Sequence, residues 1–123
     1  MSSPPSLPPP FRERLLPTNE DAADRDVADA ISRFCASSPE IEAAYVCSTE
    51  RQREGEDPVT ALRLAFKLCK PVDRSADSRQ SHHLLLERLM RSEAGLAERL
   101  GCGVLADRAV PAWEKHGVRI FAR

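Results

Sequence analysis

The sequence predicts a two-layer α+β fold, in which helices cover one face of a mainly antiparallel sheet of about four strands. Two patterns carry this prediction. Between residues 24 and 36, apolar side chains recur at the spacing of one helical stripe, at Val27, Ala30, Ile31, Phe34 and Cys35. Residues 41–48 and 59–69 instead alternate two sets of side chains, which is the period of a strand. A helix lying over an antiparallel hairpin follows from this order.

The ends of these first elements have recognisable signals. The helix begins near residue 22 or 24, where Asp21 and Asp24 are suitable caps, and it ends at residues 37–39, Ser-Ser-Pro. A charged loop over residues 50–58 joins the two strands, and Pro71 closes the second one.

The rest of the chain completes the order α-β-β-α-β-α-β. A stripe at Leu85, Leu86, Leu89 and Met90 predicts a long helix that begins near residue 77 and continues to residue 100. Gly95 costs about 1 kcal/mol inside a helix, so we expect a bend that divides it in two. Residues 103–106 then predict a short strand, residues 111–115 a helical turn and residues 118–122 a terminal strand.

The first 19 residues are predicted to form a disordered tail, because they hold six of the ten prolines. Residues 20–123 are predicted to be a single domain. The P-x-x-P pattern at residues 5–8 has a functional interpretation as a polyproline ligand, and a flexible leader is the simpler one.

Composition argues against several classes of protein. The 123 residues include 18 basic and 19 acidic side chains, and a formal net charge of −1 favours neither nucleic acid nor an anionic membrane as a partner. No apolar run approaches the ~20 residues that span a bilayer, and the N-terminus does not resemble a secretory signal. We therefore expect a cytoplasmic protein whose four cysteines are reduced.

No motif in the sequence predicts catalysis, and we expect neither a metal nor another cofactor. His82 and His83 are adjacent on a predicted helix, so their side chains point about 100° apart and do not share a metal easily. Cys102 is the best candidate for a reactive thiol, because Gly101 and Gly103 flank it. A thiol-based redox or transfer function centred on Cys102 is thus an alternative function, although a turn that needs glycine explains the same pattern.

The candidate interaction surface consists of Arg63 and Lys67 on the second strand, with Tyr45 nearby on the first. With Lys70, these residues resemble a basic strip that binds single-stranded nucleic acid, but the scarcity of aromatic residues argues against it. Pairing of Arg63 or Lys67 with Glu42 across the strands is the simpler interpretation.

An open sheet also has two edges, each able to accept a partner strand or a second copy. We therefore predict a non-enzymatic protein that binds a protein partner or forms a homodimer.

Several segments together resemble the C-terminal domain of a bacterial family, the enhanced serine sensitivity protein (SseB) family. The similarity lies in residues 39–46 (Pro-Glu-Ile-Glu-Ala-Ala-Tyr-Val), 62–66 (Leu-Arg-Leu-Ala-Phe) and 116–123 (His-Gly-Val-Arg-Ile-Phe-Ala-Arg). The closing segment departs from the family's Pro-Phe-Tyr pattern. The resemblance implies a cytoplasmic α+β domain, covers about residues 14–123 and lacks the family's N-terminal domain. The family is named for a serine-sensitivity phenotype, so it supplies no catalytic residue.

Overall fold

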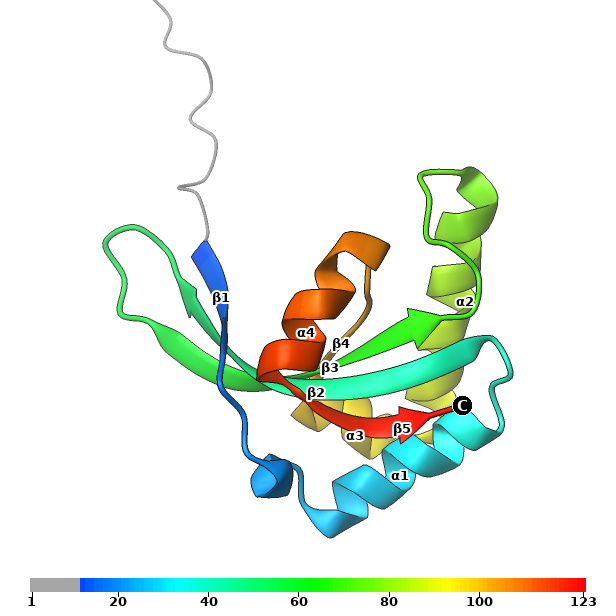
Figure 1. The fold of residues 1–123 in the computed structure, drawn as a ribbon, viewed down its shortest axis with the longest axis horizontal. Coiled ribbons are helices and arrows are strands. Elements are labelled where there is room, and N and C mark those ends of the chain that lie inside the picture. The colour runs from blue at the N-terminus through cyan, green and yellow to red at the C-terminus, as the bar shows by residue number, and fades with distance from the viewer. Residues whose placement is uncertain (1–11) are drawn as a thin grey trace, which may run out of the picture.

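The computed structural model describes residues 12–123, and these form one mixed sheet with helices on both of its faces (Figure 1). The strands follow the order β1-β2-β3-β4, and β5 also pairs with β2. Their bounds are β1 Arg12–Leu16, β2 Ile41–Gln52, β3 Val59–Leu68, β4 Gly101–Val104 and β5 Val118–Ala122. The described residues also contain two short 3-10 helices, Glu20–Ala22 and Asp107–Ala109.

All neighbouring strands are antiparallel except β3 and β4, which are parallel. The long strand β2 is central: β3 lines one of its edges, while β1 and β5 share the other at opposite ends. This arrangement confirms the predicted α+β class and its mainly antiparallel sheet.

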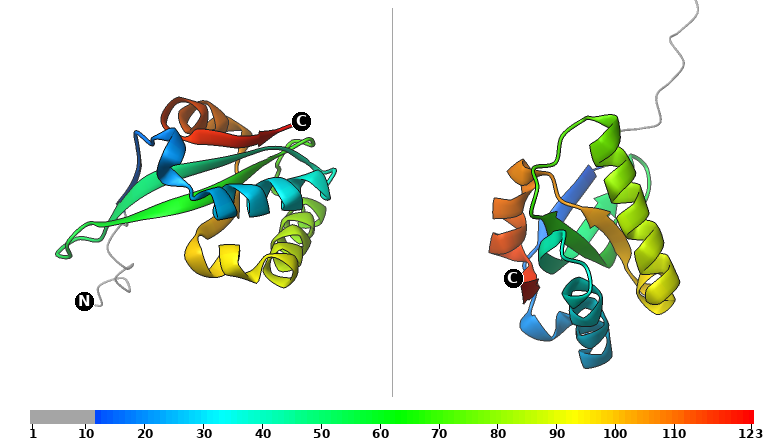
Figure 2. Two further views of the ribbon diagram at one scale, coloured as in Figure 1. Left: turned by 90° about the horizontal axis from the view of Figure 1, so that it is seen from below. Right: turned by 90° about the vertical axis from the view of Figure 1, so that its right-hand side faces the viewer.

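Three helices pack on one face of the sheet and bury the larger core (Figure 2). They are α1 (Arg25–Ala36), α2 (Ala76–Ser92) and α3 (Ala94–Arg99). All five side chains of the predicted stripe on α1 are buried, with Phe34 only 3% exposed. Its ring lies 5.7 Å from that of Phe66 on β3, centroid to centroid. The predicted helix over the hairpin is therefore confirmed.

The fourth helix, α4 (Val110–His116), lies on the opposite face, where the sequence predicted no helix (Figure 2). Its Trp113 and Val110 pack against Tyr45, Cys47 and Ala65 in a second, smaller core. The physical reason is that β2 and β3 carry apolar side chains on both faces in their central segments, so each face needs a cover.

The predicted tail over residues 1–19 is too long, because residues 12–16 form strand β1. Strand β2 extends past its predicted end at residue 48 to Gln52, and this extra length offers an edge on which β1 pairs. Arg14 and Glu50 form an ion pair across the two strands. The P-x-x-P pattern lies outside the described residues.

The long helix is divided as predicted, but at Glu93 rather than at Gly95. Strand β4 begins at Gly101, two residues earlier than predicted, so the Gly-Cys-Gly segment is a strand and not a turn.

The C-terminal residue ties the last strand to the first helix. The guanidinium of Arg123 donates to three carbonyl oxygens, those of Cys35, Ser38 and Ile41, at 2.8–3.1 Å. The end of a helix leaves carbonyl groups without intrahelical partners, and Cys35 lies in the last turn of α1, where a basic side chain near the carbonyl groups is favourable.

Candidate strand-docking site at the edge of β4

Strand β4 is an edge of the sheet, since β3 is the one strand that pairs with it among the described residues. The N–H of Leu105 donates to the carbonyl of Phe66 on β3, at 2.9 Å. Backbone groups of successive residues in a strand point to alternate sides. Gly103 therefore also directs its backbone groups toward β3, whereas Cys102 and Val104 direct theirs away from the sheet. The outer edge thus offers two donors and two acceptors in an extended geometry.

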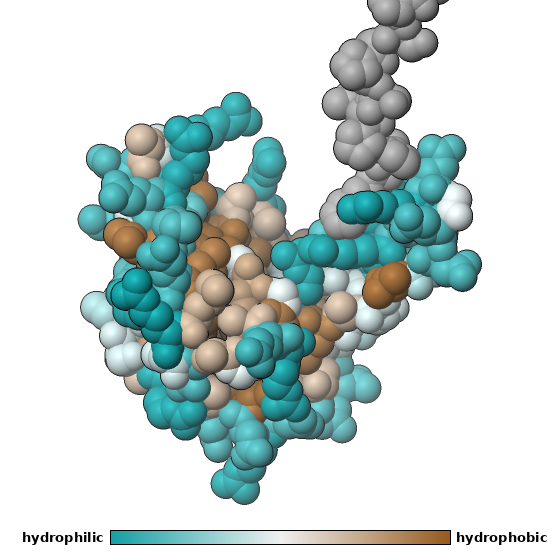
Figure 3. Space-filling model, turned by 180° about the vertical axis from the view of Figure 1, so that it is seen from behind, coloured by the Kyte–Doolittle hydropathy of each residue, from teal (hydrophilic) through white to brown (hydrophobic). Residues whose placement is uncertain are grey.

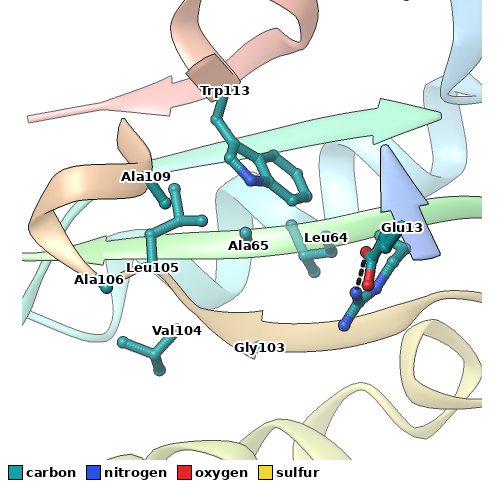
Figure 4. Close-up of a pocket in the computed structure, with 10 residues that line it drawn as sticks. Glu13, Leu64, Ala65, Gly103, Val104, Leu105, Ala106, Ala109 and Trp113 are labelled. Atoms are coloured by element: carbon teal, nitrogen blue, oxygen red, sulfur yellow. Dashed lines mark hydrogen bonds and ion pairs between the residues drawn. The ribbon is translucent and has the colours of Figure 1, made fainter. Parts of the chain in front are cut away.

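A cavity of about 210 Å³ lies beside Gly103, on the face that α4 covers (Figure 4). The indole of Trp113 and the side chain of Ala109 form one wall, while Ala65 and Leu105 form the floor. A side-chain carbon placed on Gly103 would meet no atom within 4 Å. The fold of a single chain therefore does not require glycine here. Glycine inside a strand often marks a place where another backbone or a ligand approaches closely.

Arg63 and Glu13 form an ion pair at one end of this cavity, and both residues line it. Glu13 also lies near Arg51, with 3.6 Å between Oε2 and Nε, so one carboxylate faces two guanidinium groups. The Nε atom of Arg63 is buried and has no hydrogen-bond partner within residues 12–123. A side-chain carbon on Gly101 would lie only 3.2 Å from this atom, so the guanidinium rests against β4.

The surface around β4 is apolar. Figure 3 shows apolar residues gathered in the hollow between α2 and the β2–β3 hairpin, with hydrophilic residues around them. Leu86 on α2 and Val104 in β4 are both only partly buried, and both pack against the larger core. The open backbone edge is therefore set in a surface that favours the burial of further apolar groups.

The predicted interaction surface is only partly accessible. Tyr45 is 2% exposed because α4 covers it, and its hydroxyl donates to Glu114 Oε1 at 3.0 Å. Burial, and then this bond, raise the pKa of Tyr45. Lys67 pairs with Glu42 at 2.6 Å, as the simpler interpretation predicted, and the bond raises the pKa of Lys67. Of the three predicted residues, Arg63 is the one that lines the cavity beside β4.

The predicted reactive thiol lies in β4 itself, and its side chain packs against the larger core. Burial raises the pKa of Cys102, which lowers the fraction of thiolate at neutral pH. Cys47 is buried, as expected for a core residue, whereas Cys69 is exposed after the end of β3. Cys69 is thus the most accessible thiol of the four.

A larger cavity of about 690 Å³ lies between the first turn of α2 and the end of β3. Ser78 Oγ lies 3.3 Å from His82 Nε2 there, and the hydroxyl also accepts the N–H of Asp73. These bonds order the start of α2. His83 is exposed and pairs with Glu87 one turn later. The buried Nε of Arg63, which lacks a hydrogen-bond partner among the described residues, lies beside β4 and not at this larger cavity, so the β4 edge is the stronger candidate site.

Comparisons of the chain with protein-family models, with curated proteins and with solved structures find no match. The resemblance to the SseB C-terminal domain therefore stays a prediction from residue patterns. Within residues 12–123, no helix has the length and apolar character needed to cross a bilayer.

Sequence reasoning identified Arg63 but missed Glu13, Gly103 and Trp113 as members of one site. Glu13 lay in the predicted tail, and Trp113 lay in a helical turn that the predicted fold placed on the same face of the sheet as the other helices. The available signal was the pair of glycines in residues 101–103, which suits a strand approached by another backbone as well as it suits a turn.

Proposed function

We propose that this protein is a cytoplasmic, non-enzymatic interaction module that binds an extended segment of a partner protein as an additional strand beside β4. The observation that carries the proposal is the outward backbone edge at Cys102 and Val104, next to an unfilled side-chain cavity at Gly103. In strand addition, main-chain hydrogen bonds supply affinity, and cavities for alternate side chains supply specificity.

The other edges offer less to a partner strand. The first three residues of β1 are exposed and charged, which is a common way to protect an edge. The outer side of β5 lies close to α1, and Arg123 ties its end to that helix. At β4, an open backbone adjoins both an apolar surface and a cavity.

A second copy of the chain is a poorer occupant than a different segment. Two antiparallel β4 strands would exchange hydrogen bonds between Cys102 of one copy and Val104 of the other. This register places Gly103 opposite Gly103, so neither copy supplies a side chain to the cavity. A segment with its own side chain at that position fills it.

The cytoplasmic location is supported by the four free thiols, which suit a reducing compartment. No observation favours the thiol-based alternative at Cys102, whose raised pKa works against nucleophilic chemistry.

The test is selection of linear dodecapeptides from a displayed random library against the full 123-residue chain. Affinities of the selected synthetic peptides are then compared between wild type and Val104→Pro, which removes an outward N–H that a single chain does not use. Gly95→Ala is the control for a substitution outside β4. Its added carbon meets no atom of the described residues within 4 Å, so it should not disturb the fold. We expect about tenfold weaker binding to Val104→Pro and unchanged binding to Gly95→Ala.

Three results would overturn the proposal: no selected peptide binds better than its scrambled form, Val104→Pro binds equally well, or light scattering shows a dimer that Val104→Pro dissociates. The last result would assign the edge to a second copy. If Val104→Pro does not fold, amide hydrogen exchange of the wild-type chain with bound peptide decides instead.

A further inference from the structure

We infer that the segment that binds β4 carries a bulky apolar side chain opposite Gly103 and an acidic side chain two residues away, opposite Gly101. This inference rests on the proposed function, and it specifies the chemistry of the partner.

The apolar position follows from the cavity. Directly opposite residues of paired strands place their side chains on the same face, with Cβ atoms about 4.5–5.5 Å apart. Gly103 has no side chain, so a partner side chain opposite it lies next to the cavity that Trp113, Leu105 and Ala65 line. Its volume of about 210 Å³ exceeds the roughly 150 Å³ of an apolar cavity that holds benzene. One leucine, methionine or phenylalanine side chain therefore fits there.

The acidic position follows from the charges at the end of the cavity. Residues two apart in a strand lie on one face, so the next partner side chain on this face is opposite Gly101. The guanidinium of Arg63 lies against Gly101, and its buried Nε has no acceptor in the part of the chain that the structure describes. A partner carboxylate would supply the missing acceptor through a charge-assisted hydrogen bond.

The order of the two residues reports the direction of the added strand. In an antiparallel strand the acidic residue follows the apolar one, and in a parallel strand it precedes it. Either order agrees with the inference.

The first test is the pattern shared by the selected peptides, followed by substitution of each position in a synthetic peptide. Replacing the apolar residue with Ala is expected to weaken binding to wild type about tenfold, and replacing the acidic residue with Gln about fivefold. Each effect has its own protein variant. Gly103→Val fills the cavity and should abolish the first effect, while Arg63→Gln should abolish the second.

Two further variants complete the test, one as a control and one as a second test of the acidic position. Lys67 lies on the same strand as Arg63, but its side chain pairs with Glu42 away from the cavity. Lys67→Gln should therefore preserve the preference for an acidic residue. Glu13→Gln removes the competing carboxylate, so it should strengthen binding of the acidic peptide severalfold and keeps the inference testable if Arg63→Gln does not fold.

The two levels of the proposal fail differently. Peptides that bind at β4 with no preference at either position, or with preferences that Gly103→Val and Arg63→Gln leave intact, would overturn this inference and leave the proposed function standing. An absence of any peptide that depends on the β4 edge would overturn the proposed function itself.

Discussion

Removal of the Phe34 ring is the most direct perturbation of the packing that holds α1 against the sheet. The side chain is 3% exposed, and its ring lies 5.7 Å from that of Phe66 with a tilt of 51° between the planes. The guanidinium of Arg88 lies 5.7 Å from the centre of the same ring. Phe34→Ala is expected to lower the free energy of unfolding by about 3–5 kcal/mol, because it removes the ring and leaves a cavity. Of this, roughly 0.5–1.5 kcal/mol belongs to the aromatic pair.

The assay is urea unfolding followed by circular dichroism, with the midpoint and slope measured for each variant. Leu84→Ala is the control, since Leu84 lies on the exposed side of α2 with 53% of its surface accessible. Its effect should stay within about 0.5 kcal/mol. A loss below about 1 kcal/mol for Phe34→Ala, or a loss equal to that of Leu84→Ala, would refute the packing of α1 described here.

Three further predictions concern the C-terminus and the thiols. Arg123→Ala should lower the free energy of unfolding by about 1–3 kcal/mol, because three carbonyl groups lose a charged donor, and Arg123→Lys should restore only part of it. An unchanged urea midpoint for Arg123→Ala would contradict this role. Burial raises the pKa of Cys35 to about 12 from 9.0, so the folded protein keeps a proton that the unfolded chain loses. Stability should therefore fall by about 1.4 kcal/mol per pH unit from this group between pH 9 and 12, and Cys35→Ala should show a shallower decline. Equal declines would contradict this. Alkylation at neutral pH, followed by mass spectrometry, should modify the exposed Cys69 first and the buried Cys35 and Cys47 only after unfolding. Fastest modification of Cys102 would instead revive the thiol-based function.

The parts of the fold that the sequence predicted are those with strong local periodicity. The stripe on α1 has five apolar residues at helical spacing, and all five are buried. The β2–β3 hairpin joins strands that are neighbours in sequence, so its pairing needs no long-range information. The break in the long helix was also predicted, although it falls at Glu93 rather than at Gly95.

The parts that the sequence did not predict depend on contacts between distant residues. Strand β1 forms because β2 is long enough to offer it an edge, and the charges of Arg12, Glu13 and Arg14 hid its strand character. The face covered by α4 depends on which sides of β2 and β3 remain open after α1, α2 and α3 have packed.

The candidate site was predicted even less completely than the fold. The sequence predicted that Arg63 or Lys67 pairs with Glu42, and Lys67 does, whereas Arg63 pairs with Glu13, which is 50 residues away in sequence. The predicted strand began only at Gly103, and a turn explained the Gly-Cys-Gly segment, because a parallel edge strand of four residues has no clear periodicity of its own. Sequence patterns identify which residues are apolar or charged, but the parallel β3–β4 pairing decides which of them meet.

Amide hydrogen exchange of the full chain, with and without a selected peptide, tests the central claim most directly. Strand addition at β4 predicts that exchange slows at least about tenfold at Cys102 and Val104, whose N–H groups face outward. Leu105 is the internal control, because its N–H already donates to Phe66 and its exchange should change far less. Unchanged exchange at Cys102 and Val104 in a chain saturated with peptide would contradict the account.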